Sequence, residues 1–391
     1  MAISHEVELR LGVERVAVGA WDSITITHDL LAPTSPWTVT LWRAATMAPW
    51  PETDLWPHTR AETPAEVLVD GVVQVRGAIS RAEVGASRQG SPLTLSGRDH
   101  AAIAQIADAD PALTLRGATL EEALRRLFGP LGINLTIGAL ADDARSALAG
   151  MRPNAPRGTS TSRRARRRHR VDQFRVKVGE KVWQLADQLC RRHGYLLYSA
   201  PSGDGVALVI DRPAYDSQVL YSLTRKQQPD GSYAGTILSG SRAIDTSQVP
   251  SSVTVFGHSA IASSADARLR ASIENEGLVH PRVADAFAAR PRYVRDDKAR
   301  TPQVCEQRAR REIARANANI DVCSYVVQGF GQDGRLFAVN AMSHIDDEIT
   351  GARGDWLVTQ VVMNRARSSG HTTTLRLVPK GALVIEPDPD V

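Results

Sequence analysis

The sequence predicts an α+β protein rich in β-strand, with a strand-rich region at each end and small α/β modules between them. Both ends alternate apolar and polar residues with the period of a half-buried strand. The middle contains two copies of one helix-glycine-strand unit. The residue types of a catalytic site converge nowhere in the chain. This combination is typical of an architectural protein.

The length and composition limit the possible classes of protein. A chain of 391 residues can form about two to four domains with a substantial core. Hydrophobic residues make up 42% of it, and no stretch approaches the ~20 apolar residues of a membrane span. The N-terminus carries Glu6 and Glu8 where a signal peptide has an unbroken apolar run. We therefore expect the protein to be made and folded in the cytoplasm.

The N-terminal hundred residues form the clearest β region. Apolar and polar residues alternate at 6–11 and at 23–27. Asp70 and Gly71 stand between two further alternating runs, which is a strong signal for a tight hairpin with a primed turn. Five or more short strands with little helix indicate a barrel or a sandwich. Further strands are predicted at residues 37–42 and 93–96.

A long loop, residues 44–66, interrupts these strands and contains four prolines and two tryptophans, Trp50 and Trp56. The prolines exclude a central strand there. The two indole rings have two possible roles. They can fold back over the mouth of the barrel, or they can anchor a neighbouring subunit, because tryptophan is a frequent interface hot spot.

The two helices of the middle region repeat one apolar spacing of i, i+3, i+4, i+7 and i+8. Thr119 and Glu122 predict a capping box at the start of the first helix. Gly132 and Gly194 follow at the same offset and suit a chain reversal that needs positive φ. The alternative is coincidence, since the unit is common. The matching residues are Leu120, Ala123, Leu124, Leu127 and Phe128, and Val182, Leu185, Ala186, Leu189 and Cys190.

Most of the basic character comes from one segment, residues 151–170. Six arginines lie within eight residues, so without them the formal charge of +4 falls by six to −2. The segment also contains prolines and a Ser/Thr run, with almost nothing apolar to bury, which predicts a linker or insertion. It is either a solvated tract or a docking strip for an acidic partner or nucleic acid, and it has no aromatic residue to stack on bases. The arginines are Arg163, Arg164, Arg166, Arg167, Arg168 and Arg170.

The C-terminal half repeats the strand pattern around one helix. Thr301 and Pro302 predict the helix start, and its apolar positions continue to Ala318. Strands are predicted at residues 251–256, 324–327, 356–363 and 372–378. The outward side of this helix is either a solvated surface or a subunit contact. The charged residues predicted on that side are Arg308, Arg310, Arg311, Glu312 and Arg315.

Motifs that carry chemistry are weak. The sequence lacks a His-Glu-x-x-His motif, a P-loop and a Gly-x-Gly-x-x-Gly after a strand. Residues 257–261 begin like a nucleophile elbow but lack the closing glycine. The densest carboxylate cluster, Asp346, Asp347 and Glu348, and the Arg-Gly-Asp triplet at 353–355 are both predicted to lie in turns. We therefore predict no catalytic, cofactor or metal site.

The three cysteines are Cys190, Cys305 and Cys323, an odd number at dispersed positions. This spacing does not suit a zinc site. We expect reduced, buried thiols.

Another class is a cell-wall-binding module. Residues 176–189 begin like a LysM repeat, with Gly179 before an amphipathic helix. A LysM unit needs a second helix before its second strand, whereas Gly194 leads straight into an apolar run. The alternatives to an architectural role are therefore a tail-tip peptidoglycan hydrolase or a LysM-like wall-binding protein.

The order of these pieces resembles the gpP-type tail proteins of Mu-like contractile phages, the baseplate hub family. The resemblance extends from about residue 7 to residue 383. It rests on the order and spacing of several segments, none of which is diagnostic alone. These segments are residues 96–99, 119–133, 176–198, 292–318 and 334–362.

The resemblance implies a fold and a set of partners. Each chain would supply two related antiparallel β-barrel domains, and a homotrimer would present a pseudo-sixfold ring. The ring would start the hexameric tail tube on one side and hold the trimeric central spike on the other. Other baseplate proteins and a tape-measure protein are further implied partners, in the baseplate of a virion tail or tail-like particle assembled in the bacterial cytoplasm. No cofactor, no membrane span and no specific nucleic-acid binding are expected.

The segments give five predicted regions. The basic tract is longer than the hub scaffold needs, which leaves its path open. The regions are an N-terminal barrel (1–100), a first α/β module (101–150), a basic linker or insertion (151–172), a second α/β module (173–215) and a second barrel with one long helix (216–391).

Overall fold

The computed structural model of the chain describes most of its residues. These are residues 5–18, 21–44, 46–113, 118–138, 170–171, 176–202, 205–247, 249–257, 270–274, 290–296, 299, 301–318, 320–367 and 370–383.

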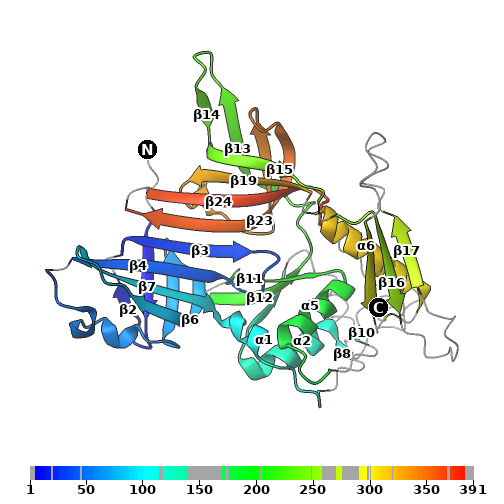
Figure 1. The fold of residues 1–391 in the computed structure, drawn as a ribbon, viewed down its shortest axis with the longest axis horizontal. Coiled ribbons are helices and arrows are strands. Elements are labelled where there is room, and N and C mark those ends of the chain that lie inside the picture. Colours follow the sequence, from blue (N-terminus) through cyan, green and yellow to red (C-terminus); the bar gives the residue numbers. More distant parts are fainter. Residues whose placement is uncertain are drawn as a thin grey trace, which may run out of the picture.

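Seven N-terminal strands form one half of a fourteen-stranded sheet (Figure 1). They lie in the order β3-β4-β7-β6-β5-β1-β2, and neighbours run antiparallel. The alternating residues of β1 and β3 are buried on one face, as their sequence predicts. The strands are β1 (Val7–Leu11), β2 (Val16–Val18), β3 (Ser23–Asp29), β4 (Pro36–Ala44), β5 (Pro64–Val69), β6 (Val72–Val84) and β7 (Gly90–Asp99).

The predicted hairpin joins β5 to β6. Asp70 and Gly71 have φ angles of +51° and +76°. Two central residues with positive φ define the primed turn that matches strand twist, so this prediction is confirmed. The preceding loop ends earlier than predicted, because β5 begins at Pro64. Proline is tolerated there, since the first residue of a strand need not donate to the ladder.

Seven C-terminal strands form the other half of the sheet. Five of the six pairings among them are antiparallel, including that of β23 with β24, but β13 and β22 run parallel. A parallel pair requires a long connection, and here more than a hundred residues separate the two strands. The strands are β13 (Val219–Gln227), β14 (Tyr233–Gly235), β15 (Ile237–Ile244), β19 (Asp321–Gln328), β22 (Ala341–Asp347), β23 (Ala352–Ala366) and β24 (Gly370–Pro379).

The long strand β23 joins the two halves. One of its edges pairs with β22 and then with β3, while the opposite edge pairs with β24. A single hydrophobic cluster draws on both halves, from Leu9 and Trp37 to Tyr325 and Leu375. The pairings among the described strands leave both sets within one sheet, rather than in the two closed barrels that the resemblance implied.

The two predicted α/β modules share one sheet and one hydrophobic cluster. In the three-stranded sheet β11-β12-β9, β9 of the first module runs parallel to β12 of the second. The apolar faces of both helices are buried in the same cluster. The elements are α1 (Ile103–Ile106), β8 (Ala118–Thr119), α2 (Leu120–Phe128), β9 (Leu135–Ile137), β10 (Arg170–Val171), α5 (Val182–Arg192), β11 (Leu196–Ser202) and β12 (Gly205–Asp211).

Local signals place the ends of these helices correctly. The Thr119 hydroxyl accepts a hydrogen bond from the Glu122 amide at the start of α2. Gly132 and Gly194 have φ angles of +66° and +81°, as the predicted chain reversals require. After α5 the chain passes Gly194 directly into β11, without the second helix of a LysM repeat.

A third unit packs α6 against a small sheet. β16 pairs with β17 on one side and β18 on the other, and α6 covers the face that carries Val253 and Val255 (Figure 1). The Thr301 hydroxyl caps the helix by accepting from the Val304 amide. The elements are β16 (Ser252–Gly257), β17 (Arg270–Glu274), β18 (Pro291–Asp296) and α6 (Pro302–Asn317).

One residue of α6 lies differently from the prediction. Glu312 is only 6% exposed and is not part of an outward surface. Its carboxylate forms ion pairs with Arg308 and Arg292, because a buried charge needs a partner of opposite sign.

The remaining elements are short. All three cysteines are free and buried, as expected. Among the described residues, no helix is both long and apolar enough to cross a bilayer. The short elements are η1 (Trp50–Glu52), η2 (Trp56–His58), η3 (His100–Ala102), η4 (Gly129–Leu131), β20 (Gly331–Gln332) and β21 (Arg335–Leu336).

Candidate functional site

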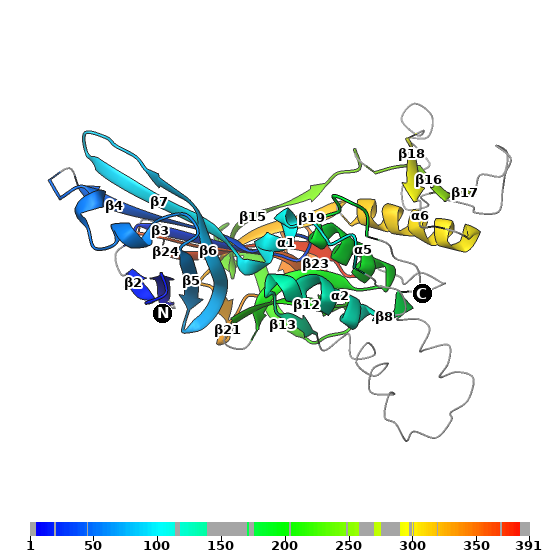
Figure 2. The same cartoon turned by 90° about the horizontal axis from the view of Figure 1, so that it is seen from below.

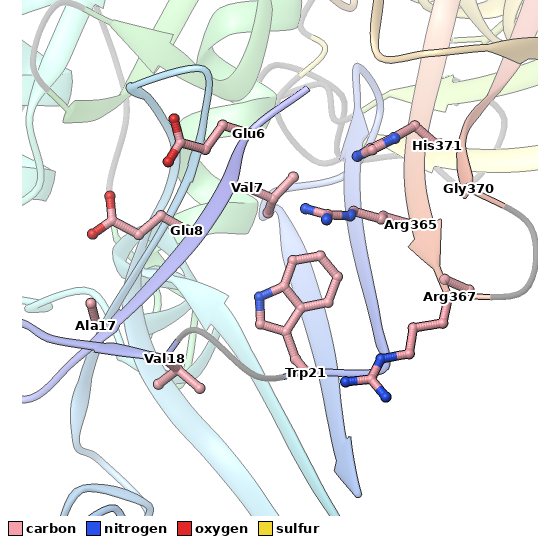
Figure 3. Close-up of a pocket in the computed structure, with 11 residues that line it drawn as sticks. Glu6, Val7, Glu8, Ala17, Val18, Trp21, Arg365, Arg367, Gly370 and His371 are labelled. Carbon is pink, nitrogen blue, oxygen red and sulfur yellow. The ribbon is translucent and has the colours of Figure 1, made fainter. Parts of the chain in front are cut away.

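A pocket of about 680 Å³ lies where the first strands of the N-terminal set meet the β23–β24 hairpin (Figure 3). Among the described residues β2 pairs only with Leu9 to Leu11 of β1, so Val7 and Glu8 at the start of β1 have a strand neighbour on the β5 side alone. Its lining residues are Glu6, Val7, Glu8, Ala17, Val18, Trp21, Arg365, Ala366, Arg367, Gly370 and His371.

The charged residues of the pocket do not all face its centre. Figure 3 shows the carboxylates of Glu6, just before β1, and Glu8, on β1, turned away from Arg365 and Arg367, whereas Val7 between them points toward Arg365. Arg365 lies at the end of β23 and Arg367 just after it. The Arg365 guanidinium stacks on the Trp21 ring, 4.4 Å from its centroid. Such stacking holds the cation in one place without cancelling its charge.

Neighbouring groups hold these charges in position. The Arg10 guanidinium, whose Nη2 lies 2.7 Å from a Glu8 carboxylate oxygen, lowers the pKa of Glu8. Arg367 Nε lies 3.3 Å from Asp22. Burial, together with the charge on Arg365, lowers the pKa of His371, which favours a neutral imidazole at neutral pH. The pocket therefore presents the Trp21 ring with the stacked Arg365 cation, an arrangement suited to packing against a polypeptide.

This pocket was not predicted from the sequence. Glu6 and Glu8 indicated only the polar side of a strand and the lack of a signal peptide, and Trp21, Arg365 and Arg367 were not singled out. No local signal marks the pocket, because its two sides are more than 340 residues apart in the chain. Across the described residues, no group of three or more His, Cys, Asp or Glu side chains could hold a metal ion.

The two loop tryptophans both pack onto their own chain. Trp50 is 4% exposed, donates from Nε1 to the Ser91 carbonyl at 3.1 Å, and lies under the Arg43 guanidinium. Trp56 is partly buried against the same hydrophobic cluster. Both tryptophan side chains therefore fold back onto their own chain. An interface role for Trp50 and Trp56 stays a prediction.

Most of the basic tract lies outside the described residues. This applies to Arg163, Arg164, Arg166, Arg167 and Arg168. The last arginine, Arg170, begins β10, which pairs antiparallel with β8. The chain therefore rejoins the α/β unit at the end of the tract, and a docking role for the tract stays a prediction.

The carboxylate cluster contains a buried ion pair. Asp346 and Asp347 end β22 instead of lying in a turn. Asp347 is fully buried, and its two carboxylate oxygens accept hydrogen bonds from Arg225 at 2.8 and 2.7 Å. The Thr350 hydroxyl and the Ile349 amide also donate to it.

This arrangement explains the charge of Asp347. Burial by itself opposes ionisation, but the hydrogen bonds from Arg225 and its neighbours outweigh it and lower the pKa of Asp347. The pair joins β13 to β22 across 122 residues of sequence. It stabilises the parallel strand pair and gives no access to a substrate.

Two other sequence motifs are structural or undescribed. The Arg-Gly-Asp triplet lies inside β23, with Gly354 at φ +96°, and not in a turn. Of the elbow-like motif, Gly257 ends β16 and residues 258–261 lie outside the described part of the chain.

A second buried polar group lies between the N-terminal strands and the α/β unit. Asp99, at the end of β7, accepts hydrogen bonds from the Ser35 amide at 2.8 Å and from the Ser199 hydroxyl of β11. His28 Nδ1 lies 2.9 Å from the Ser35 hydroxyl. Burial raises the pKa of Asp99 to about 6 and lowers that of His28 to about 4. All four side chains are at most 3% exposed, so they join two units rather than form a reaction centre.

Two solved structures that share this fold are described as tail proteins. The 43 kDa tail protein of prophage MuSo2 from Shewanella oneidensis is similar with a TM-score of 0.72 and 18% identity, over 97% of this chain and 99% of that one. The tail protein from Neisseria meningitidis MC58 has a TM-score of 0.73 and 21% identity, over 99% of both chains.

A more distant structure extends the comparison beyond phages. An E. coli component of the type VI secretion system, described as similar to the T4 bacteriophage tail proteins gp27 and gp5, has a TM-score of 0.54 and 8% identity. The match covers 97% of this chain and 79% of that one. No protein-family model and no curated protein matches the sequence. The structural neighbours therefore place the chain in the fold of phage tail proteins.

Proposed function

We propose that this chain is the baseplate hub of a contractile phage tail or tail-like particle. As a homotrimer it joins the hexameric tail tube to the trimeric central spike and starts assembly of the tube. It acts as a structural protein of the virion tail and not as an enzyme. Its partners are the tube protein, the spike protein and other baseplate proteins.

The observation that carries the proposal is the pairing of two strand sets in one chain. Each set contributes seven strands to the sheet, and β23 holds them together. Three copies of such a chain offer six strand sets, which lets a threefold ring contact a sixfold tube. The similarity to two phage tail proteins over nearly the whole chain supports the same conclusion.

The charged pocket fits this role better than it fits catalysis. It lies at the seam between the start of the N-terminal set and the hairpin of the C-terminal set. The Arg365 cation stacked on Trp21 favours contacts with a protein surface, where tryptophan and arginine are frequent hot spots. We place a partner contact of the hub here.

Multi-angle light scattering tests the proposal first. We expect a mass three times the 42.4 kDa of one chain. Electron microscopy of the same sample should show a threefold ring with a central hole. A monodisperse single-copy species at high protein concentration would contradict the hub function.

A wall-digestion assay tests the enzymatic alternative. The hub proposal predicts no clearing of purified cell wall by the full chain. Clearing that is lost in Asp346→Ala would show a hydrolase and overturn the proposal. Asp346 suits this test because it belongs to the predicted carboxylate cluster and, unlike Asp347, is not fully buried.

A further inference from the structure

The C-terminal set ends in a strand whose outer edge is open. β15 pairs with β19 along Ile237 to Ile244 and, among the described strands, with no other. Six of its eight residues are exposed, including Leu238 at 54% and Ile244 at 67%. An open strand edge presents unpaired amide and carbonyl groups to any chain that can lie beside it.

This edge lacks the usual protection against pairing. Exposed edges are commonly guarded by lysine, proline or short length. β15 is eight residues long and contains neither residue type. Its one charged residue, Arg242, binds the Asp321 carboxylate of the neighbouring strand through Nε and Nη2 at 2.8 and 2.7 Å. The charge is therefore held toward β19 and does not guard the edge.

The N-terminal set has a second open edge, the outer half of β6. β5 pairs with β6 only as far as Ala78, so within the described part of the chain Arg81 to Val84 pair with β7 alone. The hairpin of β6 and β7 reaches away from the rest of the molecule in Figure 2, at the end opposite α6.

The outer half of β6 alternates apolar and charged residues like a half-buried strand, but its apolar residues are exposed. Ala82 and Val84 lie opposite Leu95 and Leu93, so they share the face of these buried residues, yet both are exposed. Between them, Glu83 binds Arg81 on the other face at 2.9 Å. A strand added beside β6 would extend the sheet and help cover its apolar face.

We propose that the open edge of β15 in one copy pairs with the outer half of β6 in the next copy. This rests on the proposed trimer and names the strands that form it. Pairing between two different edges is heterologous and forms a threefold ring when the rotation between copies is a third of a turn, whereas pairing of β15 with itself would give a twofold dimer. Main-chain hydrogen bonds supply the contact, and Leu238, Ala82 and Val84 are the apolar side chains beside it.

Lysine substitutions on the two edges test the pairing. Ser241→Lys with Ala243→Lys guards β15, and Ala82→Lys with Val84→Lys guards β6. Both double variants should sediment as monomers at concentrations where the native chain is a trimer. Thr38→Lys is the matched control, because Thr38 is exposed on β4, whose two edges are already paired. The control should remain a trimer, and far-ultraviolet circular dichroism should match the native chain in all variants.

A disulfide test identifies which edges meet. Ser241→Cys and Ala82→Cys in one chain should give covalent dimers and trimers on non-reducing gels after mild oxidation. Each single variant should stay uncrosslinked, since the three natural cysteines are buried. Dimers from Ser241→Cys alone would show β15 pairing with itself and overturn the proposal.

The two proposals fail in different ways. A native trimer that survives both lysine double variants and forms no crosslink would overturn the strand pairing and leave the hub function standing. A native chain that is monomeric throughout would overturn both.

Discussion

Two buried aspartates show how differently the two halves of this protein handle a charge. Asp347 in the C-terminal set and Asp99 at the end of β7 are both at most 2% exposed. Asp347 faces the Arg225 guanidinium, and its pKa is lowered. Asp99 accepts hydrogen bonds from the uncharged Ser35 and Ser199, and burial raises its pKa to about 6. A guanidinium partner thus decides whether a buried carboxylate stays charged or takes up a proton.

The Arg225–Asp347 pair and the hydrogen bonds of Asp99 form two junctions with different roles. The Arg225–Asp347 pair fixes β13 against β22 at any pH at which the carboxylate is ionised. The Asp99 junction between the N-terminal strands and the α/β unit responds to pH, because its carboxylate changes charge near pH 6. An ion pair holds the first junction together. The second junction has a lower electrostatic cost when the Asp99 carboxylate is protonated.

Breaking the Arg225–Asp347 pair should have the largest effect. Arg225→Met leaves a fully buried carboxylate without its cation, which costs about 3 to 5 kcal/mol of unfolding free energy at pH 7. Urea denaturation at fixed ionic strength measures this loss. A loss below about 1 kcal/mol would show that Asp347 does not depend on Arg225.

Removing the charge of Asp99 should flatten part of the pH dependence of stability. The folded pKa of Asp99 lies above the unfolded value, so its contribution is complete below about pH 4 and is lost as pH rises through about 6. The difference corresponds to about 3 kcal/mol. Asp99→Asn should remove this fall, as measured by unfolding at pH 4.5 and pH 7.5. An unchanged pH profile would contradict the raised pKa.

Asp347→Asn should alter the profile in the opposite direction. The folded pKa of Asp347 is lowered, so its contribution is present above the unfolded pKa and is lost as pH falls below about 4. The native chain should lose stability in acid more steeply than the variant. The same denaturation series measures it, and parallel profiles for the two aspartate variants would remove the contrast between the junctions.

Single hydroxyl donors should have smaller effects. Thr350→Val removes one donor to the ionised Asp347, which costs about 1.5 to 3 kcal/mol at both pH 5 and pH 8. Ser199→Ala should cost more at pH 8 than at pH 5, because Asp99 is charged only at the higher pH. Equal pH dependence in these two variants would contradict the assignment.

The smallest effect is expected for an ion pair nearer the surface. Arg242 and Asp321 have side-chain exposures of 25% and 22%, so Arg242→Met should cost about 1 kcal/mol or less. This variant is also the control for Arg225→Met, since both remove a bidentate arginine from an aspartate. A loss as large as that of Arg225→Met would show that burial does not separate the two pairs.

Local sequence patterns determined the elements of this protein. The apolar spacing of α2 and α5, the threonine caps at Thr119 and Thr301, and the Asp70-Gly71 turn all appear where the sequence predicts them. These features depend on residues within a few positions of each other, so their places in the chain can be predicted from the sequence. The β-rich class follows from the alternating apolar and polar residues at 6–11 and 23–27.

Tertiary structure alone decided how these elements combine. The union of both strand sets at β23, the parallel pairing of β13 with β22, and the charged pocket all join segments more than a hundred residues apart. The partners Arg225 and Ser199 of the two buried aspartates lie 122 and 100 residues away from them in the chain. No local period encodes such contacts, because their free energy comes from burial and pairing that exist only after the chain has closed on itself.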